Sequence, residues 1–353
     1  MLIRCDAAPE IGFGHVVRCL ALADELRDSH GCRVDFAMLQ GPQGVAQVQA
    51  QGYEVFQTAH GIEDTDEGKW LKALIIDCQY QVLVLDVRTD LANEAVQSIR
   101  ESGVLIVTID DPSDRRLHAD LAFYPPVPQV ERMDWNCFTG KRFVGWDWVL
   151  LRTQFAEAAR KTRGGMPKAV RQTWVEDLPL TVLLTMGGSD PVGFTIKALD
   201  AISMMGIDIR VITVLGGAFM HEAALQNRPQ LANVNLEILR NVENMASVMG
   251  KVDFAISAFG QTAYELAMMR VWTAFLCTTE DHRLSCSVFE RANLGKCLCT
   301  WETTTAETFR RHIERIIIMR PFEKKIRSGL ILDGKGVQRI SMVIMENSQK
   351  SPK

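Results

Sequence analysis

A histidine at the junction of a predicted strand and a predicted helix could act as a general base. His15 lies in EIGFGHVVRCLALADEL, residues 10–26, which directly follows the apolar stretch LIRC. Gly12 and Gly14 allow a sharp turn there and let a ligand approach the backbone. The exposed N–H groups of a helix start favour neutral imidazole, the form that accepts a proton. The spacing alone favours a simpler interpretation, a capping or buried structural histidine, and Arg18 could share the face of His15 or reach solvent.

A second glycine turn follows an apolar strand in LLTMGGSDPVGFT, residues 183–195. The backbone N–H groups of Gly187, Gly188 and Ser189 could hold phosphate oxygens. Asp190 would repel a phosphate, so we expect it to cap the next helix. An ordinary strand–helix turn explains the pattern equally well.

A third junction lies in FAISAFGQTAYELAMM, residues 254–269. Ser257, Gly260 and Thr262 stand at the end of the predicted strand and the start of a helix, with Glu265 about one turn further on. A carboxylate there could accept hydrogen bonds from two ribose hydroxyls while the helix start faces a diphosphate. The alternative is a simple helix cap with Glu265 in solvent.

Two charged segments are more ambiguous. In TTEDHRL, residues 278–284, Asp281 and His282 could belong to a site or cap a helix. In TIDDPSDRRLHAD, residues 108–120, Asp110 ends a predicted strand, while the arginines that follow are typical of a solvated loop. No converging set of metal ligands can be derived from either segment.

Composition disfavours several functions. The chain has 353 residues, a net charge of −4, 47% hydrophobic residues and nine scattered cysteines without a CxxC pair. No basic surplus favours nucleic acid, and no apolar stretch approaches the ~20 residues of a membrane span. The cysteines fit a reduced compartment, so we expect a cytoplasmic protein without stable membrane insertion. Val17 replaces the third glycine of a dinucleotide fingerprint, which disfavours NAD.

Short apolar runs alternate with amphipathic stretches in both halves of the chain. Runs of Val, Ile and Leu without alternation, separated by helices, predict parallel sheets covered on both faces. The fold class is therefore α/β, with two Rossmann-like doubly wound domains. The predicted strands are 2–5, 34–39, 53–56, 82–86, 104–110, 180–186, 209–215, 234–238, 253–257, 273–277 and 296–300.

The predicted boundaries follow composition. Residues 1–155 form an N-terminal domain that carries the His15 loop, and the charged segment 156–178 contains a helix and a linker. Residues 179–330 form a nucleotide-binding domain, and 331–353 form a C-terminal helix and tail.

Four motifs, taken together, resemble a known family. IRCDAAPEIGFGHVVRCLALA, TMGGSDP, ISAFGQTAYEL and LDGKGVQRI occur in this order. The chain is similar to the UDP-sugar hydrolases of pseudaminic acid biosynthesis, which release UDP from UDP-2,4-diacetamido-2,4,6-trideoxy-β-L-altropyranose. The similarity spans nearly the whole chain, and the two middle motifs also resemble other GT-B enzymes, including MurG-type N-acetylglucosaminyltransferases. It implies the GT-B fold, in which the two domains face a cleft.

The resemblance also implies roles for individual residues. The catalytic histidine of the family maps onto His15, which would act on water that attacks the anomeric carbon, and UDP would leave with inversion. Neither a cofactor nor a metal is implied. Asp6 would order the loop or bind a sugar substituent. The predicted nucleotide-binding residues are Gly187, Gly188, Ser189, Ser257, Gly260, Thr262 and, for the ribose, Glu265.

The chain departs from the family pattern around the expected sugar and nucleotide. Arg88 in LDVRTD replaces a tyrosine and would suit a more acidic substrate, and Tyr124 stands where an asparagine is common. Asp281 and His282 replace an Asn-Gln pair, and Phe259 is also unusual. The predicted substrate-binding residues are Asp6, Gly12, Gly14, Arg18, Arg88, Tyr124, Asp281 and His282.

Three functions remain open from the sequence. The first is hydrolysis of a UDP-activated diacetamido-trideoxy sugar, or a related nucleotide sugar, with water as the second substrate. The second is a GT-B glycosyltransferase with a sugar or alcohol acceptor. The third is a non-catalytic nucleotide-sugar-binding protein of a surface-polysaccharide pathway.

Overall fold

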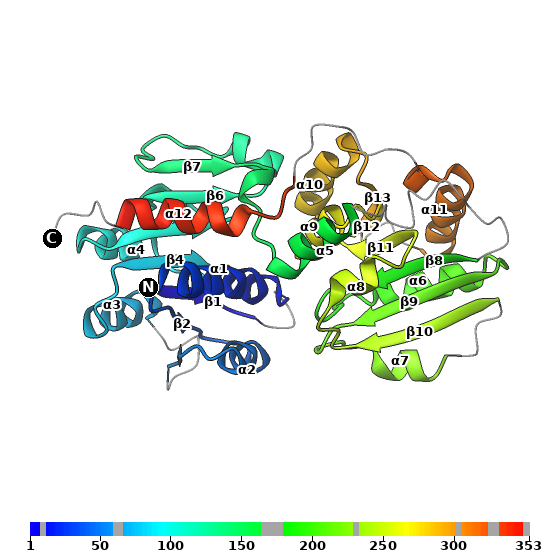
Figure 1. Ribbon diagram of the computed structural model, residues 1–353, viewed down its shortest axis with the longest axis horizontal. Helices are drawn as coiled ribbons and strands as arrows, with labels where there is room; N and C mark the ends of the chain where they lie inside the picture. Colours follow the sequence, from blue (N-terminus) through cyan, green and yellow to red (C-terminus); the bar gives the residue numbers. More distant parts are fainter. Residues whose placement is uncertain are drawn as a thin grey trace. The chain divides into compact units, whose positions relative to one another are not determined.

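The first sheet has seven parallel strands in the order β3-β2-β1-β4-β5-β6-β7 (Figure 1). In the computed structural model, residues 1–7, 12–58, 66–163, 179–228, 233–300, 305–323 and 332–348 are described. The strands are β1 (Leu2–Cys5), β2 (Asp35–Ala37), β3 (Val55–Phe56), β4 (Val82–Asp86), β5 (Leu105–Ile109), β6 (Leu121–Tyr124) and β7 (Lys141–Val144). The order reverses at β1, which pairs with both β2 and β4. In sheets of this type ligands bind beyond the carboxyl ends of the strands at such a switch point.

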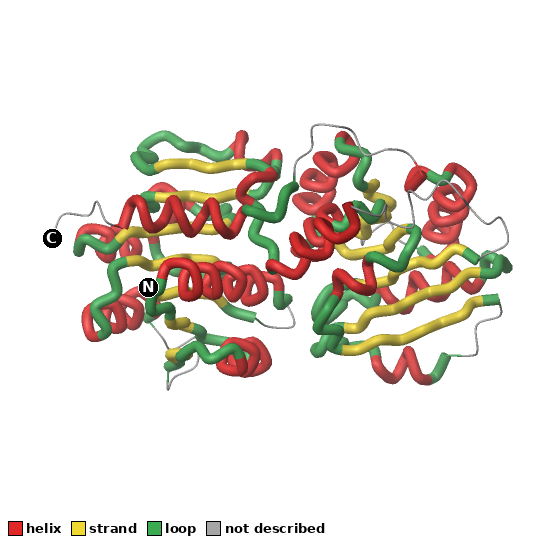
Figure 2. Tube along the Cα trace, viewed as in Figure 1, coloured by secondary structure: helices red, strands yellow, loops and turns green. Residues whose placement is uncertain are grey.

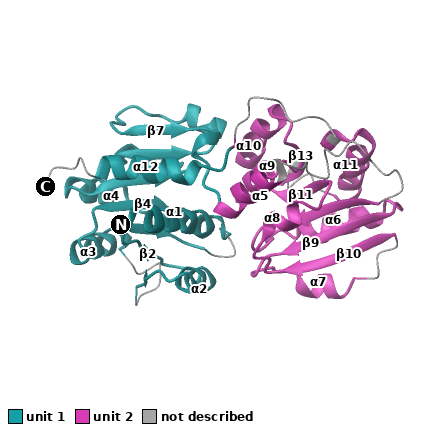
Figure 3. Ribbon diagram, viewed as in Figure 1, with its two compact units in different colours: residues 1–152, 333–353 teal, residues 153–332 magenta. Residues whose placement is uncertain are grey.

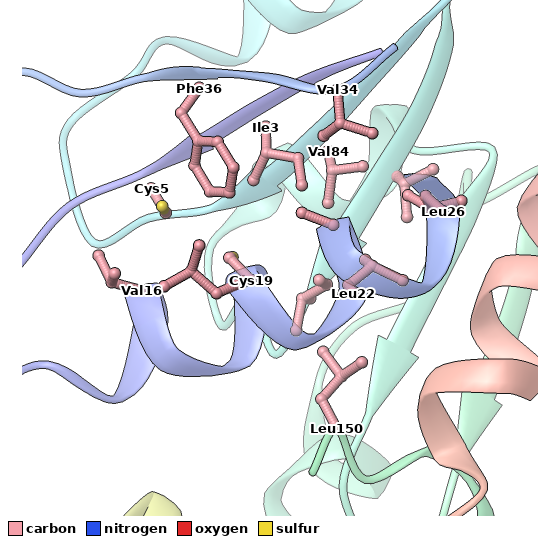
Figure 4. Close-up of a cluster of buried hydrophobic side chains, with 14 of the residues drawn as sticks. Ile3, Cys5, Val16, Cys19, Leu22, Leu26, Val34, Phe36, Val84 and Leu150 are labelled. Atoms are coloured by element: carbon pink, nitrogen blue, oxygen red, sulfur yellow. The ribbon is translucent and has the colours of Figure 1, made fainter. Parts of the chain in front are cut away.

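Helices cover both faces of this sheet (Figure 2). One face packs against α1 (Gly14–His30), α2 (Pro42–Ala50) and α12 (Gly336–Ser348), and the other packs against α3 (Glu67–Asp77) and α4 (Asn93–Glu101). Buried residues of α1 recur every three or four positions, as expected of a helix with one apolar face. Figure 4 shows this face against the strands, with Val16, Cys19, Leu22 and Leu26 of α1 near Ile3, Phe36 and Val84.

The second sheet repeats the plan with six parallel strands in the order β10-β9-β8-β11-β12-β13. They are β8 (Leu180–Thr185), β9 (Ile209–Leu215), β10 (Val234–Arg240), β11 (Phe254–Ala258), β12 (Thr273–Cys277) and β13 (Gly295–Thr300). Its switch point lies between β8 and β11. Its helices are α5 (Thr153–Arg163), α6 (Phe194–Ser203), α7 (Glu222–Gln226), α8 (Met245–Met249), α9 (Gln261–Met268), α10 (Glu280–Arg291) and α11 (Ala306–Met319).

The chain divides into two compact units (Figure 3). Unit 1 contains residues 1–152 and 333–353, and unit 2 contains residues 153–332. The helix predicted at the start of the 156–178 segment is α5, which begins at Thr153 and contacts α8 and α9 of unit 2. Residues 164–178 of the predicted linker lie outside the described residues.

The predicted α/β class with two parallel sheets is confirmed, and each predicted strand is present. Strands β6 and β7 and helix α7 were not among the predicted elements, and β6 is buried throughout but has only four residues. The burial pattern of β7 runs from two exposed to two half-buried residues. It therefore lacks the apolar run by which buried strands were recognised.

Candidate functional site

His15 pairs with a buried carboxylate at the switch point of the first sheet. His15 lies in the first turn of α1, which follows β1, and Asp86 is the last residue of the neighbouring strand β4. The distance from His15 Nδ1 to Asp86 Oδ1 is 2.6 Å. The Asp86 side chain is fully buried, and the His15 side chain is 13% exposed. The sheet order therefore brings the candidate base and its carboxylate together at the edge where ligands of this fold class bind.

The carboxylate determines which ring nitrogen of His15 can accept a proton. An ionised carboxylate only accepts hydrogen bonds, so Nδ1 donates to Asp86, and in the neutral form of the ring Nε2 carries the free lone pair. The N-cap residue of α1 is Phe13, which makes no side-chain cap hydrogen bond, so His15 is not the cap of this helix. A structural histidine held by Asp86 stays the alternative to a general base. The arrangement is that of a histidine oriented by an acid, which can serve as a general base.

Arg18 keeps this carboxylate ionised. Its Nε and Nη2 donate to the two oxygens of Asp86 at 2.6 Å and 2.5 Å. The thiol of Cys19 donates to Asp86 Oδ2 at 3.4 Å. Burial raises the pKa of Asp86, but the charges of Arg18 and His15 outweigh it and hold this pKa well below its usual range.

Asp110 and Arg88 extend the cluster outward. Asp110 Oδ2 lies 3.4 Å from Arg18 Nη1 and 3.3 Å from Arg88 Nη2. Asp110 follows β5, the strand next to β4, so Asp86, Arg88 and Asp110 all stand at the carboxyl edge of the sheet. Its φ of +51° is in the left-handed region that non-glycine residues rarely adopt.

Asp6 has a structural role in unit 1. Its Oδ1 accepts the backbone N–H groups of Leu39 at 2.8 Å and Gln40 at 3.1 Å. Its Oδ2 lies 2.6 Å from Nη2 of Arg4, and both side chains are buried. Ordering of the neighbouring loop is therefore what its contacts support, and sugar binding by Asp6 stays a prediction.

Tyr124, a predicted substrate contact, is also buried, and its contact with substrate stays a prediction. Its hydroxyl donates to the carbonyl of Asp111 at 2.7 Å, and the residue is 1% exposed. Arg115 and Arg116, expected in a solvated loop, are buried as well, and Arg115 pairs with Asp111 at 3.0 Å. The expectation of a solvated loop is wrong for these two arginines, because they hydrogen-bond to carbonyls and carboxylates inside the unit.

Gly12 and Gly14 stand before and at the start of α1. Gly12 has a φ of +76°, which favours glycine, and Gly14 is the first residue of the helix. Residues 8–11 of the opening motif lie outside the described residues.

The predicted nucleotide-binding residues gather at the switch point of the second sheet. The turn 187–189 follows β8, and Ser257 to Gly260 follow in the adjacent strand β11 and the loop into α9. Thr262 and Glu265 lie in α9, and Glu265 is buried, so the alternative of a simple helix cap with Glu265 in solvent is wrong. The structure brings these residues to one sheet edge, and nucleotide binding by them stays a prediction.

Asp190 caps α6, as expected. Its two carboxylate oxygens accept the backbone N–H groups of Phe194 and Thr195, each at 2.8 Å. Burial raises the pKa of Asp190 above its usual value, while the hydrogen bond from Thr195 opposes that shift. The helix start of α6 is therefore already occupied by a carboxylate.

Asp281 and His282 lie in the first turn of α10, which follows β12. The helix is capped by Thr279, whose side chain accepts the backbone N–H of His282 at 3.2 Å. The His282 ring lies 5.8 Å from the Phe259 ring, between centroids. His282 therefore neighbours the loop after β11, and its predicted contact with substrate stays a prediction.

Sequence reasoning did not select Asp86 or Asp110 as site residues. Each stands directly at the end of an apolar run, in VLVLD and VLIVTID. Because carboxyl ends of adjacent parallel strands meet at one edge, a polar residue in that position was the available signal. Within the described ranges, no three His, Cys, Asp or Glu residues form a group able to hold a metal ion, and no helix has the length and apolarity of a membrane span.

Comparison with known sequences gives distant relatives. No protein-family model matches the chain. The spore coat polysaccharide biosynthesis protein SpsG of Bacillus subtilis is 22% identical over 349 residues, which covers 98% of this chain and 97% of SpsG. The uncharacterized protein MJ1062 of Methanocaldococcus jannaschii is 24% identical over 287 residues, or 80% of this chain. The match spans only 56% of the length of that archaeal protein.

Comparison with solved structures identifies the fold. MurG of Acinetobacter baumannii aligns with a TM-score of 0.67 and 16% identity over 99% of both chains. UDP-GlcNAc 2-epimerase from Neisseria meningitidis, bound to UDP-GlcNAc, aligns with a TM-score of 0.64 and 11% identity over 98% of this chain and 100% of the other. The chain therefore has the two-domain α/β fold of GT-B glycosyltransferases and these epimerases, and it is distantly related to SpsG.

Proposed function

We propose that the protein is an enzyme of polysaccharide biosynthesis that hydrolyses a nucleotide sugar. The expected substrate is a UDP-activated diacetamido-trideoxy sugar, or a related nucleotide sugar, of a nonulosonic acid pathway such as that of pseudaminic acid. The observation that carries the proposal is the 2.6 Å contact between His15 Nδ1 and the buried Asp86 carboxylate, which leaves Nε2 as the base.

The proposed reaction is a single displacement. His15 Nε2 takes a proton from water while the water oxygen bonds to the anomeric carbon. The bond between that carbon and the β-phosphate oxygen breaks, and UDP leaves with the electron pair, so the configuration inverts. General-base help contributes ~10²–10⁴-fold, and orientation of the water and stabilisation of the leaving diphosphate supply the remainder.

The relatives support a UDP-sugar substrate. One structure with this fold is bound to UDP-GlcNAc, and another, of Staphylococcus aureus MnaA, is a complex with UDP. SpsG is named for spore coat polysaccharide biosynthesis. In this chain the turn 187–189 and the start of α9 are the proposed diphosphate contacts, and Glu265 is the proposed ribose contact.

The decisive experiment measures UDP release from a panel of UDP-sugars without an acceptor. We expect free sugar and UDP in equal amounts, and His15→Asn should lower turnover by ~10²–10⁴-fold. UDP affinity, measured by calorimetry, should survive this change. His30→Asn is the matched control, because His30 lies at the other end of α1, where its ring contacts Ser341 Oγ at 3.1 Å. Unchanged turnover of His15→Asn would remove His15 from the mechanism.

A glycosyltransferase is the second candidate function. The same base could take the proton of an acceptor hydroxyl, and the similar structures include MurG and the glycosyltransferase of kitacinnamycin. UDP release only after a sugar or alcohol acceptor is added would favour this function over hydrolysis. Nucleotide binding without turnover across the panel would favour a binding protein. A thermal-shift series with UDP, CDP, GDP and dTDP would identify the nucleobase that the protein binds.

A further inference from the structure

Arg88 and Asp110 form the outer, more exposed part of the candidate site. Their side chains are 33% and 26% exposed, whereas those of His15 and Arg18 are 13% and 12% exposed. Arg88 follows β4 and Asp110 follows β5, at the carboxyl edge of the sheet. The two residues are linked to the candidate base through Arg18, whose Nη1 lies 3.4 Å from Asp110 Oδ2 and whose Nη2 lies 3.3 Å from His15 Nδ1.

The contacts of the Arg88 guanidinium are long. Nη2 lies 3.3 Å from Asp110 Oδ2, and Nη1 lies 3.4 Å from the carbonyl of Val87. Hydrogen bonds between charged partners are ordinarily ~2.7–2.9 Å. The described part of the chain provides Arg88 with no other hydrogen-bond acceptor, so most of its five N–H donors remain available.

The same unit contains an ion pair of equal exposure that is fully formed. Arg100 and Asp120 are also 33% and 26% exposed, but Arg100 Nε donates to Asp120 Oδ1 at 2.8 Å. Asp120 also accepts the backbone N–H of Ile106 at 2.9 Å. This pair lies where β6 begins, at the amino edge of the sheet, away from the candidate site. Solvent exposure therefore does not explain the loose geometry of Arg88, and its position at the carboxyl edge is what differs.

The charges of the inner cluster are already matched. Arg18 binds both oxygens of Asp86 at 2.6 Å and 2.5 Å and is occupied by this carboxylate. Asp110 contacts both arginines through the same oxygen, so it keeps Arg18 as a partner when Arg88 turns elsewhere. An ion pair as exposed as Arg88–Asp110 contributes little to the free energy of folding. Arg88 can therefore give up its contact with Asp110 for a contact with a ligand at little cost in free energy.

We propose that Arg88 binds a carboxylate carried by the sugar of the nucleotide substrate or by the acceptor. The planar guanidinium can make two parallel hydrogen bonds to a carboxylate, and Asp110 holds it in place before the ligand binds. This inference rests on the proposed function and narrows it. The diacetamido-trideoxy sugar has no carboxylate, so the substrate would be a related nucleotide sugar with an acidic sugar or, for the glycosyltransferase candidate, an acidic acceptor.

The first experiment compares ligands that differ by one carboxylate. Calorimetry would measure the affinities of UDP-glucuronic acid, UDP-glucose and UDP for the wild type, Arg88→Gln and the matched control Arg100→Gln. If the donor sugar carries the carboxylate, the wild type and Arg100→Gln bind UDP-glucuronic acid about ten-fold more tightly than UDP-glucose, and Arg88→Gln reduces the ratio to about one. If Arg88→Gln instead lost affinity equally for UDP-glucuronic acid, UDP-glucose and UDP, Arg88 would be assigned to the diphosphate and the proposal would be overturned.

The second experiment needs no nucleotide binding. The NMR signal of Arg88 Nε–H, assigned by its loss in Arg88→Gln, would be followed on addition of glucuronate and of glucose. A shift with glucuronate alone, together with no preference for UDP-glucuronic acid, places the carboxylate on the acceptor. Absence of both the shift and the preference overturns the proposal. Failure to bind UDP would instead count against the proposed function, while the glucuronate titration still tests Arg88.

Discussion

Asp86 is the residue on which the geometry of the candidate base depends. It accepts from His15, from two nitrogens of Arg18 and from the thiol of Cys19, and it is fully buried. A buried carboxylate needs this many donors because burial alone disfavours its charge. Removing the carboxylate would leave Arg18 without its close partner and His15 without orientation.

This carboxylate should make acid stability depend on Asp86. Burial raises its pKa, but Arg18 and His15 outweigh burial and lower the folded-state pKa below the unfolded value of ~3.9. The stabilisation is therefore fully present above about pH 4 and is lost as the pH falls from there through the folded-state pKa. Unfolding by urea between about pH 6 and pH 2.5 should show a steeper loss in the wild type than in Asp86→Asn.

Two outcomes would count against this prediction. Parallel stability curves for the two proteins would mean that Asp86 does not contribute to acid unfolding. If Asp86→Asn does not fold, the carboxyl carbon of Asp86 can be titrated by NMR in the wild type, and an ordinary titration near pH 4 would contradict the lowered pKa.

Among the elements, the glycine turn after β8 is held by the loop after β9. The carbonyl of Gly188 accepts the N–H of Ala218 at 3.1 Å, and the carbonyl of Ser189 accepts the N–H of Met220 at 3.2 Å. Gly216 approaches this turn so closely that an added Cβ would lie 2.3 Å from the Gly188 oxygen. The turn that we propose for phosphate binding is thus positioned by the loop after the neighbouring strand β9 as well as by its own residues.

Gly216→Ala should therefore displace the turn. We expect a loss of ~1–3 kcal/mol in the free energy of unfolding, because backbone atoms must move, and weaker UDP binding. Gly250→Ala is the control, since its added Cβ would meet the nearest oxygen at an ordinary 3.5 Å. Urea unfolding and calorimetry with UDP measure the two effects, and a Gly216→Ala protein that binds UDP as the wild type does would separate the turn from nucleotide binding.

For the whole molecule, the C-terminal segment belongs to the unit that begins the chain. After unit 2, the chain returns at Asp333, and α12 packs beside α1 in unit 1. Ile340 and Ile344 of α12 are fully buried in the same cluster as Ile3 of β1. The sheet that carries His15 and Asp86 is therefore completed only when the last helix has been added.

Ile344→Ala tests this dependence. Removing a fully buried isoleucine side chain should cost ~2–5 kcal/mol of the stability of unit 1. Met342→Ala on the same helix is the matched control, because Met342 is 54% exposed and its loss should cost less than ~0.5 kcal/mol. Thermal or urea unfolding monitored by hydrogen exchange in β1 measures both, and equal effects of the two changes would contradict a structural role of α12 in unit 1.

The sequence by itself determined most of the elements and the fold class. Apolar runs without alternation predicted the strands, and the carboxylate of Asp190 predicted a cap that the structure confirms. These features depend on neighbours a few residues apart, so the local sequence carries them. Strands β6 and β7 were not predicted, because β6 is buried but has only four residues and the partly exposed residues of β7 give no apolar run.

The tertiary structure decided how the site is assembled. His15 and Asp86 are 71 positions apart and meet only because β1 and β4 are neighbours in the sheet. The same order buries Tyr124 and leaves the donors of Arg88 available. The sequence marks which residues end strands, but which strands lie side by side depends on packing across the whole unit, and that packing selects each side chain's partner.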